Sequence, residues 1–218
     1  MTSESRVAVD DAPPRLRASG LAVARGGRPL LAGLGLDLGP GSLVWLRGRN
    51  GRGKTSLLRV LAGLGAAEAG ALRRHGAIVW VGHGAALKDD LSVDENLAFL
   101  ARLHGWPADA ARRQRALDAL GVAVLARRPA RSLSQGQRRR VALSRLALAP
   151  ARALWLLDEP ADALDDEGAA RLSDLLGAHA RAGGAALWSS HAELPPTAPA
   201  AAVLDLDASA FSPRRPTA

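Results

Sequence analysis

A glycine-rich run that ends in lysine and threonine, residues 48–55, is the strongest chemical signal in the sequence. It follows an apolar run at 42–47 and precedes a helical pattern, which is the context of a phosphate-binding loop. Glycines let consecutive backbone N–H groups point inward and hold phosphate oxygens, and the start of the helix adds the positive end of its dipole. Lys54 would reach the β- and γ-phosphates, and the Thr55 hydroxyl would ligate Mg²⁺. The alternative is an ordinary glycine-rich turn. The predicted site for ATP, with Mg²⁺ as its cofactor, consists of Gly48, Arg49, Asn50, Gly51, Arg52, Gly53, Lys54, Thr55 and Ser56.

Two carboxylates, Asp158 and Glu159, follow a second apolar run at residues 153–157. A buried strand would hold Asp158 at its tip, where the carboxylate can bind Mg²⁺ directly or through a water molecule. Glu159 would then orient or deprotonate the water that attacks the γ-phosphate. An acidic residue after an apolar strand is common, and capping of the next helix is the alternative role. Because a phosphate-binding loop lies upstream, we predict the metal and base roles.

A third run, LSQGQ at residues 133–137, stands at the start of a predicted helix shortly before the strand that ends in Asp158. A serine at a helix N-cap, with a glycine that allows close approach, makes a second anion site. This run resembles the signature of the ATP-binding cassette (ABC) family, usually written L-S-G-G-Q. The alternative, a plain capped amphipathic helix, does not explain its place ahead of the Asp-Glu strand. In that family the signature, here Ser134, Gln135, Gly136 and Gln137, faces the γ-phosphate held by the opposite subunit.

The resemblance covers nearly the whole chain and places two further motifs. Asp165, in Ala-Leu-Asp at 163–165, matches the loop that communicates across the dimer. His191 matches the switch histidine that contacts the γ-phosphate. The resemblance thus implies catalytic roles for Lys54, Glu159 and His191. It also implies a homodimer that forms on ATP binding, membrane-spanning permease subunits as partners, and a peripheral position on the cytoplasmic face of the bacterial inner membrane.

Three positions depart from the common ABC pattern. His83 stands where most members have glutamine, and a neutral histidine can still bind Mg²⁺ or water. Arg25 replaces the aromatic residue that usually stacks on adenine, and a planar guanidinium can also stack on a base. Gln135 replaces the first signature glycine.

The first two departures, His83 and Arg25, together with the runs at 50–59 and 137–146, resemble the haem-exporter ATPases of the bacterial cytochrome c maturation system. That resemblance implies that ATP hydrolysis powers haem export or the release of haem from its periplasmic chaperone. The stretch 65–76 is shorter than the family usually has, which trims a peripheral strand or loop.

The elements that must position these residues follow from hydrophobic periodicity. Near-alternating apolar positions predict a hairpin at 15–24 and 29–38, and buried strands are predicted at 42–47, 77–81, 153–157, 185–190 and 201–206. Helices are predicted at 54–64, 92–103, 109–120, 134–149 and 166–182. This order predicts an α/β fold: a P-loop NTPase (RecA-like) core with a parallel sheet, an antiparallel β subdomain and an inserted α-helical subdomain at about 84–148. Residues 1–13 are predicted to be a flexible tail and 14–218 the nucleotide-binding domain.

Composition limits the functions that are open to the chain. The formal net charge is +8, but the basic residues form scattered small groups, and with no tyrosine and two phenylalanines few base-stacking platforms exist. We therefore predict no direct nucleic-acid partner. The absence of cysteine excludes a disulfide partner. No apolar run approaches the roughly 18 residues that span a bilayer, and the N-terminus is unlike a signal peptide, so a cytosolic subunit is expected.

Two other functions are left open. One is an ABC ATPase for a different small-molecule permease. The other is a soluble ABC ATPase that acts on nucleic acid or ribosomes, although such proteins usually have two cassettes or coiled-coil arms. The signature motif and His191 oppose a third alternative, a P-loop kinase.

Overall fold

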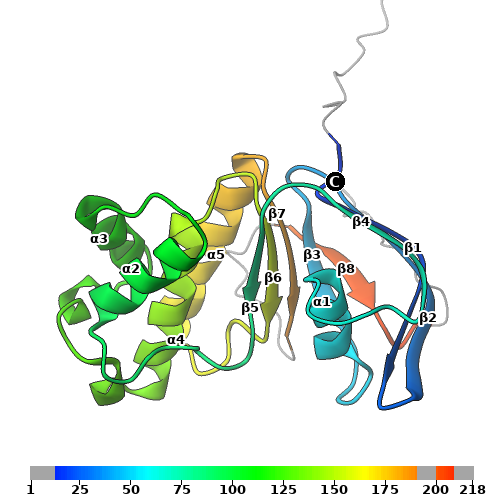
Figure 1. Cartoon of the computed structure of the whole chain (residues 1–218), viewed down its shortest axis with the longest axis horizontal. Coiled ribbons are helices and arrows are strands. Elements are labelled where there is room, and N and C mark those ends of the chain that lie inside the picture. Colours follow the sequence, from blue (N-terminus) through cyan, green and yellow to red (C-terminus); the bar gives the residue numbers. More distant parts are fainter. Residues whose placement is uncertain (1–12, 191–199, 209–218) are drawn as a thin grey trace, which may run out of the picture.

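A five-stranded parallel sheet lies at the centre of the computed structural model, which describes residues 13–190 and 200–208 (Figure 1). Its strands, in the spatial order β5-β6-β7-β3-β8, are β5 (Ile78–Val81), β6 (Leu154–Asp158), β7 (Ala185–Ser189), β3 (Leu43–Arg47) and β8 (Ala202–Asp205). Helix α1 (Lys54–Leu61) follows β3, and helix α5 (Asp166–Arg181) connects β6 to β7. Because all the paired strands run parallel, the ends that bear the predicted P-loop and Asp158 lie at one edge of the sheet.

A second, antiparallel sheet lies beside α1. It consists of β1 (Leu16–Arg25), β2 (Arg28–Leu38) and β4 (Ala69–Arg74), in the order β2-β1-β4. The first two strands form the predicted hairpin, but β4 was not predicted, because its sequence has no β-branched or aromatic residue and is mostly exposed. Its close pairing with β1 requires Gly70: a Cβ there would lie 2.5 Å from the carbonyl oxygen of Gly20.

Three helices form the side of the molecule opposite the antiparallel sheet (Figure 1, left). They are α2 (Val93–Leu103), α3 (Ala110–Ala119) and α4 (Gln135–Ser144), with 3₁₀ turns at Ala123–Leu125, Ala130–Ser132 and Arg145–Leu148. Ser92 and Glu95 form a capping box at the start of α2, which matches the predicted helix at 92–103. The helix predicted at 134–149 is α-helical only as far as Ser144 and continues as the 3₁₀ turn at Arg145–Leu148.

Two hydrophobic cores pack against opposite faces of the parallel sheet. Alternation along β6 divides its side chains: Leu154 and Leu156 pack with α1 and the antiparallel sheet, whereas Trp155 and Leu157 pack with α5 and helices α2 to α4. All four side chains are buried. A strand that is covered on both faces reads as a continuous apolar run, which is why this run could be recognised from the sequence.

Helix α1 ends earlier than its predicted end at residue 64. Gly63 adopts a positive φ of 80°, the N–H of Leu64 donates to the carbonyl of Arg59, and the N–H of Gly63 donates to that of Val60. These two bonds form a Schellman cap. The Arg74 guanidinium on β4 also donates to the carbonyls of Leu61 and Val60, so the unpredicted strand helps to end the P-loop helix.

The observed arrangement confirms the predicted fold class, with a parallel core, an antiparallel β unit and a set of inserted helices. Among the residues that the structure describes, no helix has the length and apolar character needed to cross a membrane.

Candidate functional site

The loop between β3 and α1 has the geometry of a phosphate cradle. Gly53 caps α1 with a φ of 95°, which glycine adopts readily, and the side chain of Leu30 lies directly against it. Lys54 is only 8% exposed, and its Nζ donates to the carbonyl of Gly48 at 2.7 Å. The lysine thus folds back over the loop, where its ammonium group can meet a phosphate.

The Thr55 hydroxyl and the Asp158 carboxylate meet at the edge of the sheet. Thr55 Oγ1 lies 2.9 Å from Asp158 Oδ2 and 3.1 Å from Oδ1, and it donates its proton to this carboxylate. Asp158 is 3% exposed. A hydroxyl and a carboxylate are the hard oxygen donors that Mg²⁺ prefers. The pair therefore fits a magnesium ion bound together with nucleotide phosphates.

Ser189, at the end of β7, organises both acidic residues after β6. Its Oγ donates to Asp158 Oδ1 at 2.8 Å and accepts the backbone N–H of Glu159 at 3.0 Å. Glu159 itself has a φ of 48°, a sparsely populated conformation that is found at functional sites. No local pattern marks Ser189 for this role, because only the parallel register places it opposite Asp158.

The side chain of His83 contacts Asp162 and not the Thr55–Asp158 pair. Its side chain is 73% exposed, and Nδ1 lies 3.6 Å from Asp162. Across residues 13–190 and 200–208, no three His, Cys, Asp or Glu side chains form a metal cluster. The metal role of His83 stays a prediction, and His191 lies outside the described residues.

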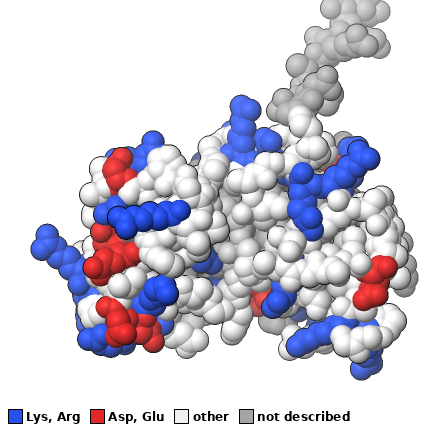
Figure 2. Space-filling view, viewed as in Figure 1, with Lys and Arg blue, Asp and Glu red and all other residues white. Residues whose placement is uncertain are grey.

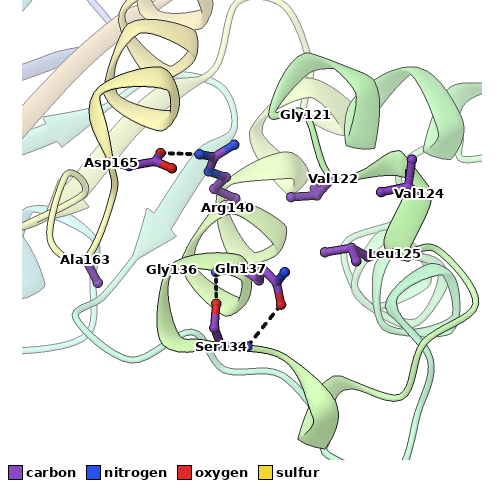
Figure 3. A pocket seen from close by; sticks show the side chains of 10 residues that line it. All are labelled: Gly121, Val122, Val124, Leu125, Ser134, Gly136, Gln137, Arg140, Ala163 and Asp165. Carbon is purple, nitrogen blue, oxygen red and sulfur yellow. Dashed lines mark hydrogen bonds and ion pairs between the residues drawn. The ribbon is translucent and has the colours of Figure 1, made fainter.

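The predicted signature forms the start of α4. Ser134 is the N-cap, its Oγ accepts the N–H of Gln137 at 3.2 Å, and the Gln137 side chain returns a bond to the N–H of Ser134. A cavity of about 330 Å³ opens beside these residues (Figure 3). It is lined by Gly121, Val122, Val124, Leu125, Ser134, Gly136, Gln137, Arg140, Ala163 and Asp165. Gln135 faces a different cavity, which His83 also lines.

Asp165 joins the signature helix to the segment that follows Glu159. Its carboxylate accepts the N–H of Gly168 at 2.9 Å at the start of α5 and forms an ion pair with Arg140 on α4 (Figure 3). The hydrogen bond from Gly168 and the guanidinium of Arg140 lower the pKa of Asp165. The side chain therefore stays ionised and ties the two predicted motifs together.

A second cavity, of about 420 Å³, lies between the P-loop and the tip of the β1–β2 hairpin. Figure 1 shows this tip beside the loop that leads into α1, and Figure 2 shows basic side chains over the same corner. The lining residues are Arg28, Pro29, Leu30, Arg49, Asn50, Gly51 and Arg52. Arg25, the predicted base-stacking residue, is exposed opposite Arg28 in the hairpin and is not among them.

Asp207, in the turn after β8, fixes the first half of the P-loop and was not among the predicted site residues. It accepts the N–H of Arg49 at 2.7 Å and forms an ion pair with Arg52 Nε at 2.8 Å. The hydrogen bond from the N–H of Arg49 lowers the pKa of Asp207, and the two guanidinium groups lower it further. No local pattern could have revealed this residue, because its partners lie more than a hundred positions away in the chain.

Comparisons with known proteins agree with this geometry. The family model described as ABC transporter matches residues 31–162. A relative from Cupriavidus necator, "Cytochrome c biogenesis ATP-binding export protein CcmA", is 50% identical over 194 residues, which are 84% of this chain and 85% of the relative. The protein of the same description numbered 2 in Cupriavidus metallidurans is 46% identical over 91% of this chain and 98% of its own length. The solved structure of an ATP-binding protein assigned to an ABC transporter in Pyrococcus furiosus is also similar, with a TM-score of 0.77, 26% identity, and coverage of 88% of this chain and 97% of that one.

Proposed function

Because this chain belongs to the ABC transporter family of ATP-binding proteins, we propose that it hydrolyses Mg²⁺-ATP as one half of a head-to-tail homodimer. The observation that carries the proposal is the convergence of Thr55 and Asp158 at 2.9 Å, with Glu159 next to them and Lys54 folded over the loop. These are a metal pair, a base and a phosphate-binding cation in one place.

Each residue has a defined task in the proposed reaction. The backbone N–H groups of residues 48–56 and the ammonium of Lys54 bind the phosphates. Thr55 and Asp158 would hold Mg²⁺, which when bound neutralises charge on the β- and γ-phosphates. Glu159 orients the attacking water and accepts its proton, and His191 is proposed to contact the γ-phosphate.

Two separate cavities support the proposal of a head-to-tail pair. The cavity beside the P-loop and the cavity beside the signature share no lining residue. The N–H groups at the start of α4 nevertheless form an anion site beside Ser134. A second copy, turned head-to-tail, would bring that site to the γ-phosphate on the first P-loop.

The partners and the process follow from the relatives. We propose that the chain is the ATP-binding export subunit of a cytochrome c biogenesis transporter, at the cytoplasmic face of the inner membrane. It would bind separate membrane-spanning permease subunits, and its hydrolysis would drive export of haem or its release from a periplasmic chaperone. The helices α2 to α4 would pass the motion of the dimer to those subunits.

The first test is a trapped dimer. With Mg²⁺ and ATP, Glu159→Gln should elute at twice the monomer mass in size-exclusion chromatography with light scattering, whereas ADP should leave it monomeric. Glu167→Gln, an exposed glutamate on α5, is the matched control and should turn over ATP like the wild type. Wild-type turnover by Glu159→Gln would show that another group is the base.

The second test concerns the partners. The protein is purified by affinity from native membranes, and its companions are identified by mass spectrometry. Small polytopic proteins of cytochrome c maturation are expected. A different permease would keep the transport function and remove the haem assignment, and only soluble or nucleic-acid-bound companions would overturn transport.

A further inference from the structure

One arginine on the signature helix contacts both the segment that bears the two carboxylates and the loop that follows β5. Arg139 lies on α4, and its guanidinium donates to five backbone carbonyl oxygens. Nε donates to Pro160 at 3.1 Å. Nη1 donates to Gly82 at 2.8 Å and to His83 at 3.2 Å. Nη2 donates to Asp158 at 2.9 Å and to Glu159 at 2.6 Å. A guanidinium has five N–H donors, so every one of them is used.

The environment of this guanidinium makes its arrangement costly to disturb. Arg139 is 4% exposed, and burial lowers its pKa, while the negative charges of Asp162, Asp158 and Glu159 oppose that shift. Within the described residues it has no ion-pair partner closer than 4.0 Å, so its bonds go to the main chain. A rigid planar fork that is bonded only to the backbone fixes the path of the chain around it.

The conformation of Glu159 explains why such a fixture is needed. Its φ of 48° places a non-glycine residue in the left-handed region, which persists only when the surroundings hold it. Arg139 donates to the carbonyls of Asp158 and Glu159, which are the peptide carbonyls before and after the Cα of Glu159. Ser189 holds the N–H of Glu159 from the other side.

We propose that Arg139 is a positioning residue for hydrolysis: it fixes the backbone of Glu159 and connects that backbone to the helix that begins at the signature. This inference rests on the proposed function. When the partner's nucleotide docks at the start of α4, a shift of that helix reaches Glu159 and the loop at 82–83 through one guanidinium. Arrival of the partner's nucleotide is thereby coupled to alignment of the base.

The test uses the transporter complex purified from membranes, with the substitution Arg139→Gln. A misplaced base lowers turnover without removing the phosphate cradle, so we expect kcat to fall about 100-fold while the Kd for ATP changes less than about twofold. The matched control is Arg138→Gln on the same helix, whose guanidinium bonds Asp89 and the carbonyl of Ala130 and reaches neither catalytic segment. Its kcat should stay within about twofold of the wild type.

Arg139→Lys keeps the buried charge and guards against loss of folding. A lysine has three N–H donors in place of five, so it should fold and retain ATP affinity but recover only part of the kcat. Full activity of Arg139→Lys, equal losses in Arg138→Gln and Arg139→Gln, or a rise in Kd with unchanged kcat would each overturn the positioning role. Failure of the wild-type complex to hydrolyse ATP would instead overturn the proposed function.

Discussion

Replacement of Ser189 by alanine removes one hydroxyl that is hydrogen bonded on both sides. Ser189 is fully buried; its Oγ donates to Asp158 at 2.8 Å and accepts the N–H of Glu159 at 3.0 Å. A hydrogen bond to a charged group contributes about 1.5–3 kcal/mol, and loss of the acceptor of a buried N–H costs about 1–3 kcal/mol. Because both losses arise from one group, we expect the free energy of unfolding to fall by about 2–4 kcal/mol and kcat to fall at least about tenfold.

Ser173→Ala is the matched control for this experiment. Ser173 is 1% exposed, and its Oγ donates to the carbonyl of Ala169 within α5 and not to either carboxylate. Urea unfolding gives the stability of each variant, and steady-state ATPase assays give kcat and KM. The control should lose at most about 1 kcal/mol and keep its kcat. If Ser189→Ala behaves like the control in both assays, Ser189 does not organise the acidic pair.

Two other predictions concern pH and nucleotide binding. Burial lowers the pKa of His179 below its usual 6.5, and His104 is shifted in the same direction by burial. The unfolded chain therefore binds protons that the native state excludes, so stability should be fully present above about pH 6.5 and should decrease as the pH falls below it. Melting temperatures from pH 7.5 to 5.5 test this, and His179→Gln should flatten the dependence; an unchanged slope would contradict it. For nucleotide binding, Arg28 borders the cavity beside the P-loop, where its guanidinium can stack on the base. Arg28→Ala should therefore weaken the binding of ATP about three- to tenfold, but hardly that of inorganic tripolyphosphate, which has no base. Fluorescent-nucleotide displacement measures the binding of both ligands. Arg25→Ala, outside that cavity, should have the smaller effect on ATP binding; a larger effect would favour Arg25 over Arg28 as the base-binding residue.

The local motifs could be recognised from the sequence because short-range geometry encodes them. The P-loop requires glycines at fixed spacing, and a helix start requires a capping residue with its partner three positions later, as at Ser92 and Ser134. The strand that ends in Asp158 is apolar throughout because both of its faces are buried. Each of these patterns lies within a few residues, so it can be read without knowing the fold.

The partners of those motifs could not be predicted in the same way. Ser189 meets Asp158 only through the parallel register of β6 and β7, and Asp207 meets the P-loop only because β8 lies beside β3. Similarly, β4 is a strand because β1 is available to pair with it, not because its own residues favour one. In the sequence Arg139 is one basic residue in a run of three, and only its burial and its carbonyl partners in the fold distinguish it from Arg138.

The sequence by itself thus determined the kind of chemistry, the family and the order of the α-helices and strands apart from β4. Tertiary structure decided which side chains contact the backbone of the candidate site: Ser189 and Arg139 at Glu159, and Asp207 at the P-loop. The physical reason is range. Capping, turn and periodicity preferences act over a few residues, whereas a buried hydrogen bond forms wherever packing brings a donor to an acceptor, however far apart they lie in the chain.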